Sequence, residues 1–311
     1  MTVRIGISGW RYARWRGVFY PKGLRQKDEL AYAARTFPTV EINGTFYSMQ
    51  RPAFFAAWAD AVPTGFVFAV KGPRFITHML KLNRAETPLA NFFATGVLRL
   101  GRKLGPILWQ LPPNLAFNAD KLESFFALLP RTADQAAQLA TRHDNRFKAA
   151  PFLDAGPAQR LRHAIEVRHD SFRDPAFIAL LRRHNVALVC ADTVDWPLLM
   201  DVTADFVYCR LHGSTQLYTS GYGPKALATW AACVRAWSAG GNAKGIHASP
   251  VPARRRRARD VYVYFDNDAK VRAPLDAQAL MRLLNLGPSS TPARHIASPA
   301  DPSRTGSSAR H

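Results

Sequence analysis

The stretches 164–168 (AIEVR), 186–192 (VALVCAD) and 206–212 (FVYCRLH) are short apolar runs that carry charged or polar residues at or near their ends. Runs of this kind are typical of parallel strands that are buried on both faces. Five more such runs occur in the chain, at 3–8, 39–43, 66–71, 106–111 and 261–268.

Segments with apolar residues three and four positions apart, typical of helices, alternate with these runs. They lie at 28–36, 53–61, 89–104, 119–129, 175–184, 226–239 and 276–284. Asn118 and Asp174 stand where helix N-caps are expected. Two stretches interrupt the alternation: 131–162, where we expect a polar helix or an excursion, and 239–260, which predicts a long surface loop. The pattern favours an α/β fold, a parallel sheet closed into a (β/α)8 TIM-type barrel.

Length and composition favour a single domain. The chain has 311 residues, 48% of them hydrophobic, and one α/β barrel commonly takes about 250 residues. We expect the barrel to span 1–286 and the Pro/Ser-rich stretch 287–311 to be a disordered tail. No stretch offers the ~20 uncharged apolar residues of a membrane span, and Met1–Gly9 lacks a signal-like apolar core, so we expect a cytoplasmic protein without membrane contact. The three cysteines lack CxxC spacing and are expected to be free thiols.

The net charge is +20, from 42 Lys and Arg against 22 Asp and Glu. Part of the excess is local, in a run that contains Arg254, Arg255, Arg256, Arg257 and Arg259. Such charge predicts nonspecific affinity for nucleic acid through these arginines. The chain has neither a helix-turn-helix nor an RNP motif, so a solvated surface loop is the favoured interpretation of the run.

Polar residues near the strand ends are the candidates for chemistry, because barrel enzymes act at the C-terminal mouth. Residues two apart on a strand share a face, as do the pairs Glu41 and Asn43, Glu166 and Arg168, and Arg210 and His212. Glu41 lies in an apolar run, so its carboxylate needs a buried partner, either Lys71 or an arginine across the barrel. A structural ion pair and a catalytic acid or base are both open for Glu41.

Lys71 ends the third run. A lysine there can bind an anion or, if desolvated, act as a base or Schiff-base nucleophile. We favour anion binding.

The candidates form two groups. The catalytic candidates are Glu166, His212, Glu41 and Asp192. The substrate-binding candidates are the cations Lys71, Arg168 and Arg210, the rings Trp10, Tyr12, Tyr47 and Tyr264, and the polar side chains Asn43, Thr77, His78, Gln110 and Asn267. The rings could stack on a ligand, although the aromatic cluster that begins at Trp10 could equally plug the barrel mouth.

A carboxylate-rich metal site is the alternative for the same mouth. Hard divalent ions prefer oxygen ligands, which would come from Glu41, Glu166, Asp192, Asp266 or Asp268, with His212. Lys71, Arg168 and Arg210 are predicted at the same mouth and would compete for these carboxylates. We therefore expect ion pairs and no metal.

The chain resembles the YecE-like family, known as domain of unknown function 72, whose members adopt a TIM-barrel fold. The resemblance spans residues 3 to about 285. It rests on Ile5–Trp10 with Tyr12, Trp15, Gly17 and Phe19–Pro21; on Glu41, Asn43 and Thr45–Tyr47; on Phe68, Val70, Lys71 and Ile76–His78; on Leu104–Pro106 and Gln110–Pro113; on Glu166–His169 and Ser171; and on Asp192, Arg210, His212, Gly213, Tyr262, Tyr264, Phe265, Asn267 and Asp268. Departures are Asp266 and Phe172, where the family usually has Asn and Trp, and the arginine run, which looks like an insertion.

The resemblance implies the fold and leaves the reaction open. Our leading hypothesis is an enzyme, a hydrolase, lyase or isomerase without an organic cofactor, acting by acid–base chemistry on a small anionic or polyhydroxylated substrate. Glu166 would be the general acid or base and His212 its complement. The alternatives are a divalent-metal enzyme of the sugar-isomerase or endonuclease type and a non-catalytic nucleic-acid-binding barrel. The oligomeric state is open.

Overall fold

Eight parallel strands form a closed barrel in the computed structural model, which describes residues 2–213, 217 and 220–287. Each strand pairs with its neighbours in chain order, and β8 closes the barrel by pairing with β1. The strands are β1 (Val3–Ser8), β2 (Thr39–Ile42), β3 (Val67–Lys71), β4 (Leu104–Gln110), β5 (His163–Glu166), β6 (Ala187–Asp192), β7 (Phe206–Leu211) and β8 (Asp260–Phe265). The predicted TIM-type barrel is confirmed; β1 has the predicted bounds, and the ends of the other strands differ from the prediction by at most three residues.

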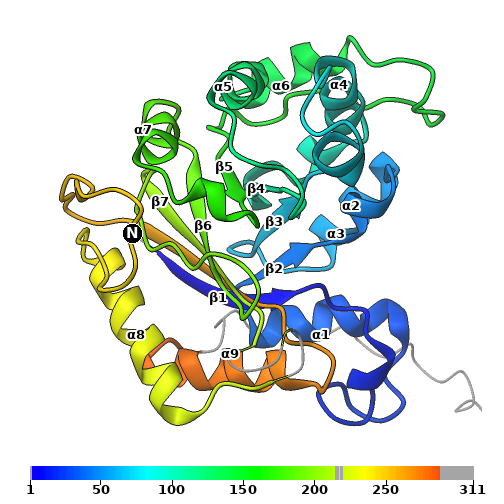
Figure 1. Ribbon diagram of the computed structural model, residues 1–311. Helices are drawn as coiled ribbons and strands as arrows, with labels where there is room; N and C mark the ends of the chain where they lie inside the picture. The colour runs from blue at the N-terminus through cyan, green and yellow to red at the C-terminus, as the bar shows by residue number, and fades with distance from the viewer. Residues whose placement is uncertain (1, 214–216, 218–219, 288–311) are drawn as a thin grey trace, which may run out of the picture.

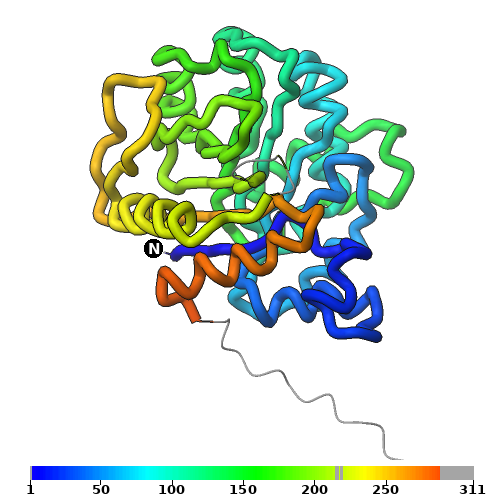
Figure 2. Tube along the Cα trace, turned by 60° about the horizontal axis from the view of Figure 1, so that its bottom comes forward, coloured from blue at the N-terminus to red at the C-terminus, as the bar shows by residue number. Residues whose placement is uncertain are grey.

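Helices surround the strands, as Figure 1 shows. In Figure 2, α8 and α9 run side by side, and α9 also packs on β1. The α-helices are α1 (Glu29–Thr36), α2 (Gly44–Tyr47), α3 (Pro52–Asp60), α4 (Glu86–Ala94), α5 (Ala119–Leu128), α6 (Ala133–Ala140), α7 (Pro175–Arg183), α8 (Pro224–Ser238) and α9 (Arg272–Leu283). Shorter helical segments are Ala13–Trp15, Gln26–Asp28, Phe75–Met79, Val97–Lys103 and Asp170–Phe172.

Local sequence signals explain most helix boundaries. The side chains of Asn118 and Asp174 accept hydrogen bonds from backbone N–H groups in the first turns of α5 and α7, as predicted. The single helix expected over 89–104 is wrong, because Gly96 adopts φ +95° and divides it into α4 and a short second segment. The stretch 131–162 contains α6, and 239–259 has neither helix nor strand.

Each strand has two buried faces with different neighbours. The outward face packs against the helices in the main core, whereas a second apolar cluster, which includes Ala164, Phe206 and Tyr208, fills the barrel interior. Along the inward faces the residues change from apolar at the strand start to charged at the strand end, as in Phe206–Tyr208–Arg210. Alternation thus places the charged side chains at the C-terminal mouth.

The structure also bears on the predictions for the cysteines, for membrane contact and for the C-terminal tail. Cys190, Cys209 and Cys233 are buried free thiols, as expected. Among the described residues, no helix has the length and apolar character needed to cross a membrane. Most of the predicted tail, residues 288–311, lies outside the described part of the chain.

Candidate functional site

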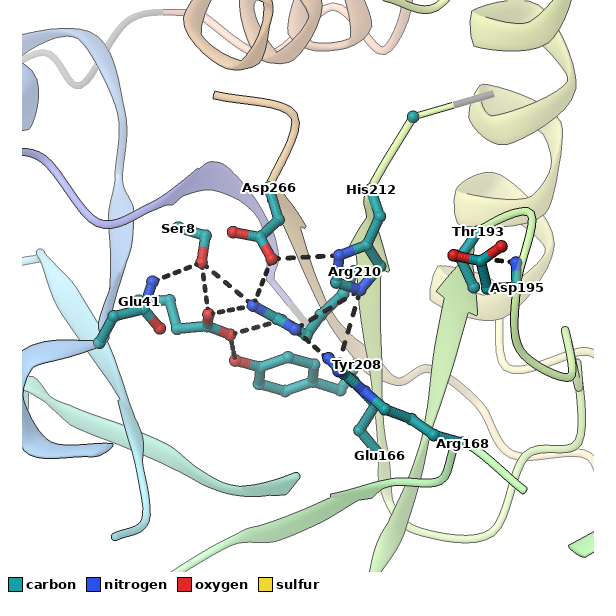
Figure 3. A network of polar contacts seen from close by, with 12 residues as sticks. Ser8, Glu41, Glu166, Arg168, Thr193, Asp195, Tyr208, Arg210, His212 and Asp266 are labelled. Carbon is teal, nitrogen blue, oxygen red and sulfur yellow. Dashed lines mark hydrogen bonds and ion pairs between the residues drawn. The ribbon is translucent and has the colours of Figure 1, made fainter. Parts of the chain in front are cut away.

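Arg210 lies at the centre of a buried network of charged side chains across the C-terminal mouth (Figure 3). Its Nε and Nη2 donate to the two carboxylate oxygens of Glu41 over 3.1 and 2.9 Å, and its Nη1 donates to Oε2 of Glu166 over 2.7 Å. Nη2 also donates to Oδ2 of Asp266 over 2.8 Å. One guanidinium therefore joins carboxylates from β2 and β5 and from the end of β8.

Neutral hydroxyl groups complete the coordination of Glu41. The Ser8 hydroxyl donates to Oε1 over 2.6 Å, and the Tyr208 phenol donates to Oε2 over 2.5 Å. Glu41 is fully buried, so these bonds replace the water that the carboxylate loses on folding. Of the two roles open for Glu41, the geometry favours the structural ion pair, with an arginine from across the barrel as the partner.

The Glu166 carboxylate is bound on both oxygens. Oε2 accepts from Arg210, and Oε1 accepts from Nε of Arg168 over 2.9 Å. Burial alone would raise the pKa of Glu166, but the two arginines hold it well below its usual range. Burial raises the pKa of Asp266 as well, but the charge of Arg210 outweighs burial, and the pKa is lowered. Both side chains are therefore ionised at neutral pH, and neither has a proton to donate.

His212 is completely buried beside this network. Its Nδ1 lies 3.1 Å from Oδ2 of Asp266, and its Nε2 lies 3.8 Å from Oε2 of Glu166. The ring meets Trp196 edge to face at 5.7 Å, and the Arg168 guanidinium stacks on the same indole at 3.7 Å. His212 and Arg168 thus both pack against the indole ring of Trp196.

Lys71 differs from the two arginines. The residue is 6% exposed, yet its ammonium makes no hydrogen bond or ion pair with any residue that the structure describes. It lies 4.1 Å from the centre of the Phe46 ring, a cation–π contact. Burial, with the positive charge of Arg210, lowers the pKa of Lys71 to about 8. Lys71 is therefore desolvated, as a lysine that acts as a base must be.

An aromatic cavity of about 390 Å³ opens beside the network, and four of the predicted substrate-binding residues, Trp10, Tyr12, Asn43 and Tyr47, line it. Asn43 connects it to the network, because its Nδ2 donates to the Ser8 hydroxyl over 2.9 Å. The buried Oδ1 of Asn43 has no hydrogen-bond partner among the described residues.

A second cavity of about 490 Å³ lies on the other side of α2, lined by Phe46, Tyr47 and Phe75 among others. Neither Arg210 nor Lys71 lines either of these cavities.

Two further titratable groups lie at the mouth. Burial, together with the positive charges of Arg168 and Lys71, lowers the pKa of His78 to about 4, and its Nδ1 is hydrogen-bonded to the Thr77 hydroxyl. Burial and the charge of Asp266 raise the pKa of Asp268 to about 6. Burial, Asp266 and Asp268 raise the pKa of Tyr12, so the charge of Asp268 reaches a ring that lines the aromatic cavity.

Several predicted site residues lie away from the network. Asp192 accepts from Nε1 of Trp230 on α8 over 3.1 Å, on the outer face of the barrel. The phenol of Tyr264 bonds Thr39 inside the barrel, and Asn267 donates to Asp276 on α9.

Gln110 is buried and pairs in register with Glu166. Gln110 therefore lies next to the network, unlike Asp192, Tyr264 and Asn267. Its side chain makes no hydrogen bond within the described part of the chain.

Sequence reasoning missed other members of the site. Ser8, Tyr208, Phe46 and Trp196 were not among the candidates. Strand alternation could have indicated Tyr208, which stands two residues before Arg210. Trp196 lies outside the strands and helices, where no periodicity points to the mouth.

The arrangement gives no support to the metal alternative. Among the described residues, no group of three His, Cys, Asp or Glu side chains is placed to hold a metal ion. The carboxylates of Glu41, Glu166 and Asp266 instead surround the fixed positive charge of Arg210. Asp192, expected as a further ligand, faces α8.

Fold and site together define a TIM-barrel protein with a charged network across its C-terminal mouth. Residues 4–301 match the family described as "Protein of unknown function DUF72", and the chain belongs to that family. Similar curated proteins are UPF0759 protein YecE of Escherichia coli K12, 24% identical over 170 residues (55% of this chain, 50% of YecE), and UPF0759 protein YunF of Bacillus subtilis, 29% identical over 119 residues (36% and 40%). The matched segments thus span half or less of these relatives.

Solved structures agree in fold. A DUF72 family protein of Thermotoga maritima superposes with a TM-score of 0.69 at 23% identity, covering 92% of this chain and 100% of that one. A DUF72 family protein of Enterococcus faecalis gives 0.66 at 19% identity, covering 92% and 96%. At these identities the likeness shows the shared barrel alone.

Proposed function

We propose that this protein is an enzyme that acts on a small anionic or polyhydroxylated compound at the C-terminal mouth, without an organic cofactor. The observation that carries the proposal is the ammonium of the buried residue Lys71, which forms no ion pair with a carboxylate in the described part of the chain. The carboxylates nearby are already bound to arginines. A cation on a buried residue that forms no ion pair with the described residues is a site that an anionic group of a ligand can complete.

Lys71 also suits proton transfer. With a pKa of about 8, its ammonium and amine forms are both populated near neutral pH, as a general acid or base requires. The role first given to Glu166 fits Lys71 better, because Glu166 is held ionised by Arg210 and Arg168. Glu166 and His212 then keep the arginines in place, and Asp268, with a pKa of about 6, is the complementary group near the aromatic cavity.

The aromatic cavity supports a polyhydroxylated ligand. Trp10, Tyr12 and Tyr47 line this cavity, and aromatic side chains are the type on which the C–H face of a sugar packs. The Oδ1 of Asn43, a buried acceptor without a partner in the described residues, can receive a ligand hydroxyl.

The test separates charge from proton transfer at one position. Lys71→Met removes both, and Lys71→Arg keeps the charge but cannot release its proton near neutral pH. In a screen of sugar phosphates and hydroxy acids, we expect both variants to lose about a hundredfold or more in turnover. Lys71→Arg should keep binding of inorganic phosphate measured by calorimetry, which Lys71→Met should lose.

The matched control is Lys225→Met, an exposed lysine on α8. It should change neither turnover nor phosphate binding. Full turnover in Lys71→Met for any substrate that the wild type converts would refute the role of Lys71.

A further inference from the structure

The opposite end of the barrel contains a cavity of about 600 Å³, here called the basal cavity. It is formed where β1, β7 and β8 begin, together with the segments that lead into β4 and β5. Six arginines line it: Arg4, Arg102, Arg131, Arg160, Arg162 and Arg183. Its volume lies in the range of about 300–1,000 Å³ that is usual for pockets for small molecules.

Acidic groups in the basal cavity are few. Its lining includes two carboxylates, Asp205 and Asp260, against the six guanidinium groups. Asp260 is occupied, because its Oδ2 accepts from Arg162 and its Oδ1 from the backbone N–H of Thr2, both over 2.7 Å. Arg183 pairs with Glu123 over 2.7 Å. The other four arginines have no carboxylate partner among the described residues, so the cavity has a strong positive potential.

Some of these guanidinium groups are already held in place. Arg4 lies 5.7 Å from the Tyr262 ring and Arg162 lies 5.2 Å from the Phe206 ring. Arg131 is partly buried, and Nη2 donates a long bond of 3.3 Å to the Phe126 carbonyl. Burial lowers the pKa of Arg131, so the site lacks the counter-charge that would offset its desolvation. Cations already ordered by ring contacts lose less conformational entropy when a ligand binds.

We propose that the basal cavity binds a compact polyphosphate, an anion with two or more linked phosphate groups. One guanidinium group can donate two parallel hydrogen bonds to two oxygens of a phosphate. Several arginines around one cavity therefore suit a ligand with several adjacent phosphates better than a ligand with a single carboxylate. The one histidine in the lining, His184, is bonded to Glu123 over 2.7 Å, and the lining has no cysteine or lysine. The basal cavity is thus a binding site, separate from the chemistry proposed at the other mouth.

Linked phosphates can come from a free molecule or from a nucleic-acid strand. We expect the full chain to bind inorganic tripolyphosphate with one-to-one stoichiometry in calorimetry at 150 mM salt, an ionic strength of about the physiological value. A single-stranded oligothymidylate is the second probe. If the oligothymidylate displaces tripolyphosphate from the basal cavity, a nucleic-acid strand is the source of the linked phosphates. If tripolyphosphate binds and the oligothymidylate does not displace it, the ligand is a free polyphosphate.

Two double variants remove equal charge from different places. Arg102→Gln with Arg160→Gln removes two exposed arginines of the basal cavity that have no carboxylate partner among the described residues, and it should weaken tripolyphosphate binding about tenfold or more. Arg254→Gln with Arg255→Gln, in the exposed loop before β8, should change it less than about twofold. Lys71→Met should leave it unchanged, which separates this site from the proposed active site. Equal loss in both double variants, or no saturable binding by the wild type, would overturn the proposal.

Discussion

The two ends of the barrel both contain arginines, but in opposite electrostatic settings. At the C-terminal mouth Arg210 contacts three carboxylates, and Arg168 shares one of them. In the basal cavity six arginines face two aspartates. The first arrangement holds the strands together, whereas the second leaves cations available to a ligand. The same residue type is thus a structural element at one end and a candidate binding element at the other.

The net charge of the chain is therefore a poor guide to the position of its functional sites. Part of the +20 excess lies in the arginine run before β8. Arg259 of that run is 2% exposed and donates to the carbonyls of Gly241 and Arg254, so it shapes the loop from inside. Arg254–Arg257 are exposed, and their affinity for nucleic acid stays a prediction.

The largest expected effect tests whether the two ends differ in stability. Arg210→Met should lower the free energy of unfolding by about 3–5 kcal/mol, because three buried carboxylates lose their counter-ion. Arg160→Met, at an exposed arginine of the basal cavity with no ion-pair partner in the described part of the chain, should change the free energy of unfolding by less than about 0.5 kcal/mol. Urea denaturation followed by circular dichroism measures both. Similar losses in the two variants would remove the distinction between the ends.

The next effect concerns Lys71, whose ammonium forms no ion pair with the residues that the structure describes at the C-terminal mouth. Its folded-state pKa of about 8 lies below the ordinary lysine value of 10.5, so the folded state binds this proton less tightly than the unfolded chain does. The cost to stability is full below pH 8 and vanishes as the pH rises through 10.5. Lys71→Met should therefore stabilise the protein at pH 7, by on the order of 3 kcal/mol.

The pH profile is the decisive measurement for Lys71. The difference in unfolding free energy between Lys71→Met and wild type should shrink steadily between pH 8 and 10.5. Lys225→Met, at an exposed lysine, should show no such trend. A constant difference across this range would mean that Lys71 keeps an ordinary pKa.

The smallest effect sharpens the boundary between the network and the neutral barrel interior. Tyr208→Phe removes a bond to the charged Glu41 and should cost about 1.5–3 kcal/mol of unfolding free energy. Tyr264→Phe removes a bond to the neutral Thr39 hydroxyl and should cost about 1 kcal/mol. Equal costs, measured by the same denaturation, would show that the network does not extend to Tyr208.

Strand alternation was enough to predict much of the mouth. Glu166 with Arg168, and Arg210 with His212, were placed on shared faces from their spacing, and the structure brings all four together. The fold followed from the alternation of apolar runs and helical segments, supported by the family resemblance. These inferences succeed because side-chain direction along a strand has a period of two residues.

The remaining site could not be predicted for a physical reason. A strand buried on both faces is apolar on both, so its sequence does not tell which face is inside. Asp192 pairs in register with Leu211, next to the pair of Ala191 with Arg210, and therefore faces outward. Lys71 has no ion-pair partner among the described residues because Arg210, from another strand, binds the carboxylates of Glu41 and Glu166. No local pattern reports such competition.

The position of Arg210 late in the chain has a consequence for how the barrel forms. Its partner Glu41 precedes it by 169 residues. A half-barrel of β1–β4, emerging first during synthesis, would bury the carboxylate of Glu41 without Arg210. The charge of Lys71 on β3 reaches Glu41 but forms no ion pair with it, so such an intermediate has an electrostatic reason to stay open. Closure then waits for β7, and folding should be slow and concerted, as is general when key contacts are distant in sequence.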